Sequence, residues 1–124
     1  YTKLASRTLV SLFKKDDKTI IVVTMDCSND WEVHKTLANY FFDNFEMYLF
    51  MKQGIIDIDD TSYPYVPFIY EDIIYPLREE ERLKVNVHLY KISNSDKIGY
   101  IKIYLITSLN EEVFIKNIYV YRYY

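Results

Sequence analysis

Hydrophobic and polar residues alternate most regularly in the last third of the chain. From Leu83 to Tyr90, every second side chain is apolar and the side chains between them are polar or aromatic. A period of two predicts a strand with one buried and one solvent-facing side. Residues 99–107 and 113–123 have a similar character, and short polar turns at 93–97 and 109–112 separate the three segments. The pattern therefore predicts an antiparallel meander of three long strands.

A second pattern, with the period of a helix, covers residues 30–53, and Gly54 follows it. At about 100° per residue, the polar side chains fall on one narrow stripe and the rest of the circumference is apolar. The stripe consists of Glu32, Lys35, Thr36, Asn39, Asp43, Glu46 and Gln53. Asn29 or Asp30 suits the N-cap, and Gly54 suits the left-handed position after the last turn. We therefore expect a long helix that a curved antiparallel sheet covers on several sides.

The remaining segments predict one further helix and three strands. Residues 1–15 have apolar positions at helical spacing, which favours a short amphipathic helix, with a strand as the alternative. Residues 19–25 are β-branched and uncharged, which indicates a buried strand. Residues 55–59 alternate as a strand does. Residues 68–75 could form an edge strand or one helical turn, and the prolines on either side favour the edge strand.

This order of elements predicts a single α+β domain over residues 1–124, in which one long helix packs against a curved antiparallel sheet. A chain of this length forms one hydrophobic core. In architecture alone the order resembles cystatin-like and NTF2-like rolls, in which a bent sheet holds one helix. No motif assigns the chain to either family, and fold alone does not give function.

Composition limits the classes of partner. Half of the residues are hydrophobic and 18% are aromatic, which excludes a disordered chain. The net charge is −3 and the pI is near 5.3, so bulk charge gives no reason to expect nucleic acid or an anionic membrane as partner. No run approaches the roughly 18 apolar residues of a membrane span, and we expect none.

The cysteine count, the first residue and the codon bias bear on the compartment and the origin of the protein. The single Cys27 cannot form an internal disulfide, which favours a reducing compartment such as the cytoplasm. The chain begins at Tyr1 rather than Met, so it could be a processed product or an excised piece. Ile, Tyr, Lys and Phe are abundant whereas Ala, Gly, Pro and Arg are scarce, a bias of AT-rich codons that suggests a virus or another mobile or parasitic genome.

The predicted long helix carries the first candidate site. His34 lies on its apolar side, where a polar group must either find a hydrogen bond in the core or line a cavity. We favour a core histidine. The alternative is a small-ligand or enzymatic pocket between helix and sheet, lined by His34, Tyr40, Asn44 and Tyr48.

Two other groups of residues contain side chains that can carry chemistry. Asp57, Asp59 and Asp60 could face a hard cation, but the spacing of a calcium loop is absent and a solvated strand end explains them. Cys27 and His34 could form a nucleophile and base, but no glycine for an oxyanion hole is near them. No phosphate-binding loop, zinc spacing or dinucleotide motif is present. We expect no catalytic activity, no metal and no cofactor.

The third candidate is the solvent-facing side of the meander. A plausible register places there the residues Tyr90, Tyr100, Lys102, Tyr104, Tyr119, Tyr121 and Tyr123. Surfaces rich in tyrosine are typical of protein contacts, although tyrosine is also simply a good strand former. Such a face could also stack unpaired bases, but the acidic charge and the absence of an RNP-like motif speak against it.

We therefore predict a non-enzymatic protein-binding module. It binds another protein, or itself as a homodimer, through the tyrosine-rich face or an edge strand near residues 63–75. A viral or mobile-element inhibitor or accessory factor is a hypothesis of role that suits the small acidic chain. A structural subunit of a larger assembly is a further alternative, because the same face would serve it equally well.

Overall fold

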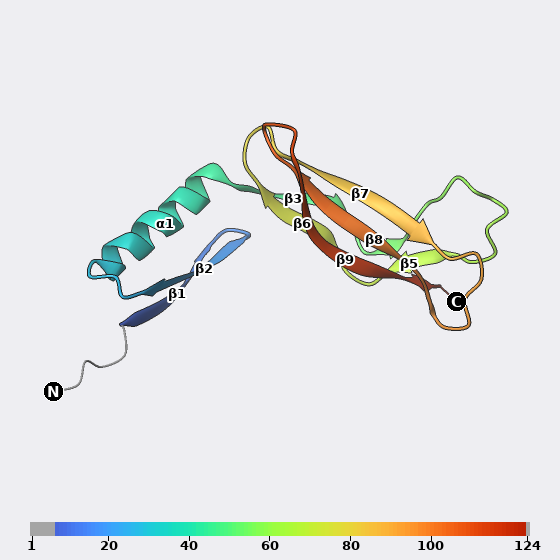
Figure 1. Ribbon diagram of the computed structural model, residues 1–124, viewed down its shortest axis with the longest axis horizontal. Coiled ribbons are helices and arrows are strands. Elements are labelled where there is room, and N and C mark those ends of the chain that lie inside the picture. The colour runs from blue at the N-terminus through green and yellow to red at the C-terminus, as the bar shows by residue number, and fades with distance from the viewer. Residues whose placement is uncertain (1–6, 124) are drawn as a thin grey trace. The chain divides into compact units, whose positions relative to one another are not determined.

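The protein, in a computed structural model that describes residues 7–123, has an α+β architecture with one helix and a strongly curved antiparallel sheet (Figure 1), as the sequence predicted. The elements are β1 (Thr8–Lys15), β2 (Lys18–Met25), α1 (Asp30–Asn44), β3 (Glu46–Met51), β4 (Gly54–Ile55), β5 (Pro67–Ile69), β6 (Ile73–Leu77), β7 (Arg82–Leu89), β8 (Lys97–Ile106) and β9 (Glu112–Arg122). The chain divides into two compact units, one ending at Met47 and one beginning at Tyr48. That these units form a single domain stays a prediction.

The N-terminal unit consists of the β1–β2 hairpin and α1. The strands are antiparallel and joined by a tight turn in which Asp16 adopts a φ of 55°. Alternation places Ile20 and Val22 on the side of α1, whereas Ile21 and Val23 are exposed on the other side. β2 follows residues 8–15 directly in the chain, and its β-branched residues favour the extended conformation. It can therefore pair with residues 8–15 along their whole length through an antiparallel ladder of hydrogen bonds.

The helix predicted for residues 1–15 is therefore wrong where the structure describes it, since residues 8–15 form β1. The apolar spacing of that segment suits either period. In the strand, Phe13 is half-buried and Leu12 is exposed, although a helix would have buried both on one face. Residues 1–6 of the prediction lie outside the described part of the chain.

Charged side chains hold both ends of α1. The Arg7 guanidinium donates to the carboxylate of Asp30, with Nε 2.5 Å from Oδ2, and Asp30 is almost fully buried at the first turn. At the other end, the Lys18 ammonium donates to the carbonyl of Phe42 at 2.8 Å. A carboxylate near the N-terminus and a cation at the last carbonyls both suit the helix dipole.

The helix ends at Asn44, nine residues before the predicted end, and residues 46–51 form β3. The Asn44 amide donates to the carbonyl of Tyr40 at 2.8 Å, and Phe45 takes an extended conformation. A side chain that bonds the backbone in this way competes with the next helical turn. The aromatic residues that follow are good strand formers, and β6 pairs with β3.

The C-terminal unit contains the five-stranded sheet, in the order β4-β5-β9-β8-β7, and the separate β3–β6 pair. The meander of β7, β8 and β9 confirms the prediction to within two residues at each end. β5 lies between β4 and β9, so the prediction of an edge strand at residues 68–75 is wrong for Phe68. The buried core consists of Ile56, Ile69, Ile73, Leu83, Ile98, Ile101, Ile103, Ile118 and Val120, all from this unit.

Candidate functional site

The side of the sheet opposite this core carries most of the aromatic residues that the structure describes in the C-terminal unit. The registers align His88 with Tyr100 and Tyr100 with Tyr119, so these three side chains form a row across β7, β8 and β9. A second row aligns Phe68 of β5 with Tyr121. We call this surface the aromatic face; it consists of Phe68, Tyr70, His88, Tyr90, Tyr100, Lys102, Tyr104, Phe114, Asn117, Tyr119, Tyr121 and Tyr123.

Ring contacts form two main clusters on the aromatic face, one around Tyr100 and one around Tyr121. The rings of His88 and Tyr100 stack almost parallel, with centroids 5.1 Å apart, and Tyr90 lies edge-on to Tyr100 at 6.4 Å. In the second cluster, Tyr119 contacts Tyr121 at 6.5 Å, and Tyr121 contacts Tyr70 at 5.1 Å. Within each cluster, neighbouring rings limit the side-chain orientations that each ring can adopt.

The remaining rings extend the face at its two ends. Phe68 stacks on Tyr123, with the ring centroids 5.3 Å apart. At the opposite end of β8, Tyr104 meets Phe114 at 5.8 Å. A register shift after Ile103 brings Phe114, rather than Ile115, opposite Tyr104. The bulge thus adds one more exposed aromatic ring to the face.

A shallow cleft of about 410 Å³ lies within the aromatic face. It is lined by Tyr90, Tyr100, Lys102, Asn117 and Tyr119. Four of these five residues belong to the set predicted from the sequence, and the structure brings them together from β8, β9 and the end of β7. The cleft combines phenol rings, one ammonium group and one amide, which can accept or donate hydrogen bonds beside apolar contact.

The charges on this face are mostly positive. The Lys97 ammonium lies 4.0 Å from the centroid of the Tyr119 ring, a cation–π contact. Nearby carboxylates are paired elsewhere, because Glu112 bonds Lys84 and Glu71 bonds Lys116. Among the described residues, no carboxylate forms an ion pair with Lys97 or Lys102. An acidic chain therefore presents a locally basic aromatic surface.

A glycine and a tyrosine hydroxyl support the backbone that carries the aromatic face. A Cβ atom at Gly99 would overlap the carbonyl oxygen of His88, so only glycine allows β7 and β8 to approach so closely beside the His88–Tyr100 stack. The Tyr63 hydroxyl donates to the carbonyl of Tyr90 at 2.7 Å, which ties the end of β7 to the loop before β5. Burial, with a smaller contribution from Tyr65, raises the pKa of Tyr63.

His34, the first candidate from the sequence, is fully buried between α1 and the hairpin. Its Nδ1 lies 2.7 Å from the Ser11 hydroxyl and its Nε2 lies 2.9 Å from the Thr24 hydroxyl. A neutral imidazole has one donor and one acceptor, and two hydroxyl groups satisfy both. This is the geometry of a core histidine, and it leaves neither ring nitrogen to activate Cys27.

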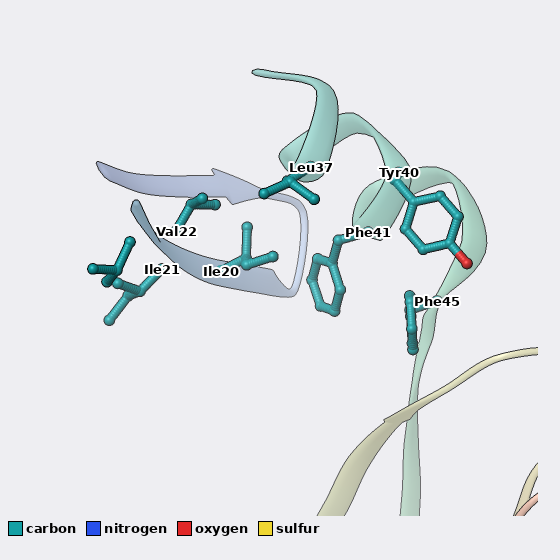
Figure 2. A pocket seen from close by; sticks show the side chains of 8 residues that line it. Ile20, Ile21, Val22, Leu37, Tyr40, Phe41 and Phe45 are labelled. Atoms are coloured by element: carbon teal, nitrogen blue, oxygen red, sulfur yellow. The ribbon is translucent and has the colours of Figure 1, made fainter. Parts of the chain in front are cut away.

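The other predicted pocket residues do not gather around His34. Tyr40 lines an apolar groove of about 400 Å³ in the N-terminal unit, shown in Figure 2. The groove is lined by Ile20, Ile21, Val22, Val23, Leu37, Tyr40, Phe41 and Phe45. Asn44 bonds its own helix, and Tyr48 lies in β3 of the C-terminal unit. The groove is therefore hydrophobic, without the polar lining that the sequence suggested.

The acidic segment lies on the surface. Asp57 and Asp59 are exposed and follow β4 rather than forming part of it. Asp60 accepts hydrogen bonds from the backbone and the hydroxyl of Ser62, which lower its pKa. Within residues 7–123, no three acidic, histidine or cysteine side chains converge in a way that would hold a metal ion.

The comparisons with known proteins give no family for this chain. No protein-family model matches it, and no curated protein is significantly similar to it. In the described part of the chain, no helix combines the length and the apolar character that crossing a membrane requires. The function must therefore be argued from the surface itself.

Sequence reasoning missed several members of the aromatic face. Asn117 lies two residues before Tyr119, so the alternation of β9 could have placed it there. Lys97, which is not itself a member but contacts the Tyr119 ring, lies beyond a register shift that no pattern in the sequence signals. Phe68 lies in the short strand β5 and Tyr70 directly follows it, and the partner of β5, β9, is about 50 residues away in the chain.

Proposed function

We propose that the protein is a non-enzymatic binding module that recognises another protein through the aromatic face. The observation that supports this most strongly is the pair of packed aromatic clusters, one around Tyr100 and one around Tyr121, on the same side of the sheet as two lysines without carboxylate partners. Tyrosine provides a large contact area at low cost in side-chain entropy, and it is enriched at the centres of protein interfaces. The role of an inhibitor or accessory factor of a virus or mobile element is part of this proposal.

Binding through the aromatic face would cost little side-chain entropy, because its rings are already packed against one another in the free protein. Tyr119 and Tyr123 keep about half of their surface exposed, although the ring of Tyr121 packs against Tyr119 and that of Phe68 stacks on Tyr123. A partner would bury these rings without first having to order them. Interface tyrosines commonly cost about 2 kcal/mol when truncated to alanine, so two of them contribute about 100–1,000-fold in affinity.

The test is partner capture with matched variants. The purified chain is used to capture proteins from extracts of the organism that encodes it, and captured proteins are quantified by mass spectrometry. We expect the Tyr104→Ala/Tyr121→Ala double variant to lose the captured partner. Tyr48→Ala is the control, because it removes an exposed tyrosine from β3, outside the aromatic face.

Lys102→Glu provides a second variant for the case in which the double variant is unstable. Lys102 makes no ion pair among the described residues, so the reversal should leave the fold intact while it weakens binding. Thermal melting of each variant verifies folding. If folded variants of the face capture the same proteins in the same amounts as the wild type, the proposal is wrong.

A nucleic-acid partner for the same face is tested separately. We expect a fluorescent 20-nucleotide single-stranded RNA to show no binding at low micromolar protein concentration in moderate salt. Aromatic stacking and lysine contacts would give measurable, strongly salt-dependent binding if bases were the natural ligand. Tight RNA binding that the tyrosine variants abolish would contradict the proposal of a protein partner.

A further inference from the structure

One edge of the N-terminal hairpin lacks the features that normally protect an exposed strand. Within residues 7–123, β1 and β2 pair only with each other, so each has a free edge. Residues 19–25 of β2 contain no charge, proline or glycine, whereas β1 ends in Lys14 and Lys15. Free edges in natural proteins usually carry lysine, proline or a bulge, because a bare edge pairs with other strands. The edge of β2 is therefore suited to pairing.

The register shows which backbone groups this edge presents. The amide of Asp26 donates to the carbonyl of Arg7, which marks these two residues as a hydrogen-bonded pair. In an antiparallel ladder such pairs alternate with pairs whose N–H and C=O groups point away from each other. The backbone groups of Ile21 and Val23 therefore point away from β1, towards the free edge of β2.

The apolar groove lies along this same edge. Four consecutive residues of β2, from Ile20 to Val23, line it, and no residue of β1 does. Figure 2 shows Leu37 and Phe41 of α1 directed towards the hairpin beside Ile20 and Val22, with Ile21 on the side away from the helix. An incoming strand at this edge would find hydrogen-bond partners and, above them, an apolar helix surface.

We propose that a second copy of the chain occupies this edge, so that two β2 strands pair antiparallel about a twofold axis at Val22. Ile21 then lies opposite the partner's Val23, and the two hairpins form one continuous four-stranded sheet. The dimer uses a different surface from the aromatic face, so it is independent of the proposed binding function. Isologous pairing of this kind closes the assembly at two copies.

The spacing of the elements favours this occupant. Strands pair about 4.8 Å apart, so the centres of the two hairpins would lie about 10 Å from each other. A twofold axis perpendicular to the sheet leaves both α1 helices on the same face. Helices centred over their hairpins would lie about 10 Å apart, which is the usual distance between packed helices. Leu37 and Tyr40 of each copy would then meet across the axis and close the groove.

The exposed area at this edge fits a weak dimer. The apolar side chains Ile21, Val23, Met25, Leu37 and Tyr40 keep between 44% and 70% of their surface exposed. With about 200 Å² for each side chain as an upper value, two copies expose at most about 1,100 Å² together. Pairing at the edge buries only part of this area, because Ile21 and Val23 project from the face away from α1. The buried part is below the range of stable specific interfaces, so we expect a dissociation constant of tens of micromolar, on the order of weak encounters.

Two proline variants test the proposal on opposite edges of the hairpin. Val23 and Val10 are directly paired across β1 and β2, are similarly exposed at 57% and 62%, and have N–H groups that point away from the hairpin. Proline at either position removes no hydrogen bond within the hairpin. Only Val23→Pro, however, removes hydrogen bonds between the two copies.

The measurement is light scattering coupled to size exclusion between 1 and 200 micromolar protein. We expect the wild type and Val10→Pro to approach about 30 kDa, twice the 15.0 kDa of the chain, at the upper concentrations. Val23→Pro should shift the midpoint of association at least tenfold upwards. If the proline variants do not fold, Ile21→Lys and its cross-strand control Leu12→Lys make the same comparison with exposed side chains.

Three results would overturn the proposal. The first is a wild type that remains monomeric at 200 micromolar. The second is a dimer that the variants on both edges affect equally or not at all. The third is a dimer that only the Tyr104→Ala/Tyr121→Ala variant dissociates, because self-association would then use the aromatic face. The capture experiment with the tyrosine variants is read independently, so failure of one proposal does not imply failure of the other.

Discussion

Replacing His34 by leucine should destabilise the N-terminal unit because it leaves two hydroxyl groups without their partner. The ring is fully buried and contacts the hydroxyls of Ser11 and Thr24 through its two nitrogens. Leucine has a similar volume and cannot form either hydrogen bond. A buried hydroxyl that loses its partner costs about 1–3 kcal/mol, and the cost is at the lower end for Ser11 and Thr24 because both are half-buried. We expect a loss of about 2–4 kcal/mol.

A triple variant tests whether the unpaired hydroxyl groups cause the loss of stability. Combining His34→Leu with Ser11→Ala and Thr24→Val removes the orphaned hydroxyls along with the ring. Replacing all partners of a buried hydrogen bond by apolar groups is close to neutral. The triple variant should therefore recover most of the lost stability and lie within about 1 kcal/mol of the wild type.

Urea unfolding followed by tryptophan fluorescence measures this prediction. Trp31 is the only tryptophan and lies in α1, so its emission reports the N-terminal unit, while far-UV circular dichroism reports both units. With a slope of about 1–3 kcal/mol per molar urea, a loss of 3 kcal/mol lowers the midpoint by about 1–3 M. A His34→Leu midpoint equal to the wild type, or a triple variant as unstable as the single one, would refute this account of His34.

Two further predictions concern the support of the aromatic face. Gly99→Ala forces a Cβ against the His88 carbonyl, so we expect a loss of about 1–3 kcal/mol in chemical denaturation; an unchanged midpoint would contradict the close approach. Burial raises the pKa of Tyr63, so its contribution is fully present below about pH 10 and is lost as the pH rises towards the folded pKa. Tyr63→Phe should cost about 0.5–1.5 kcal/mol at pH 7 through the lost bond to Tyr90. Its melting temperature should also fall less between pH 9 and 11 than that of the wild type, and parallel curves would argue against the pKa shift.

The aromatic face shows how far alternation alone can place residues. Because side chains alternate along a strand, Tyr100, Lys102 and Tyr104 had to share one side of β8. A plausible pairing then brought Tyr119 and Tyr121 to the same side, as the register shows. The rows that β5 contributes could not be predicted, because Phe68 reaches Tyr121 only after a long loop has closed.

The choice between helix and strand depended on which strand is available as a pairing partner. The apolar run after Asn44 satisfies a helical period, yet it forms β3 because β6 is available to pair with it. Likewise, residues 8–15 suit either period, and β2 decides between them. Where local preference is nearly balanced, the hydrogen bonds of a strand partner determine the outcome.

The sequence by itself determined the strands of the meander, the start of α1 and the common side of the tyrosines, because each depends on a short-range period of hydrophobic burial. Only the tertiary structure decided where α1 ends, which hydroxyls satisfy His34, and that the edge of β2 lies beside an apolar groove. These features arise from contacts between residues that are distant in the chain, and a local pattern contains no information about which partner will be present.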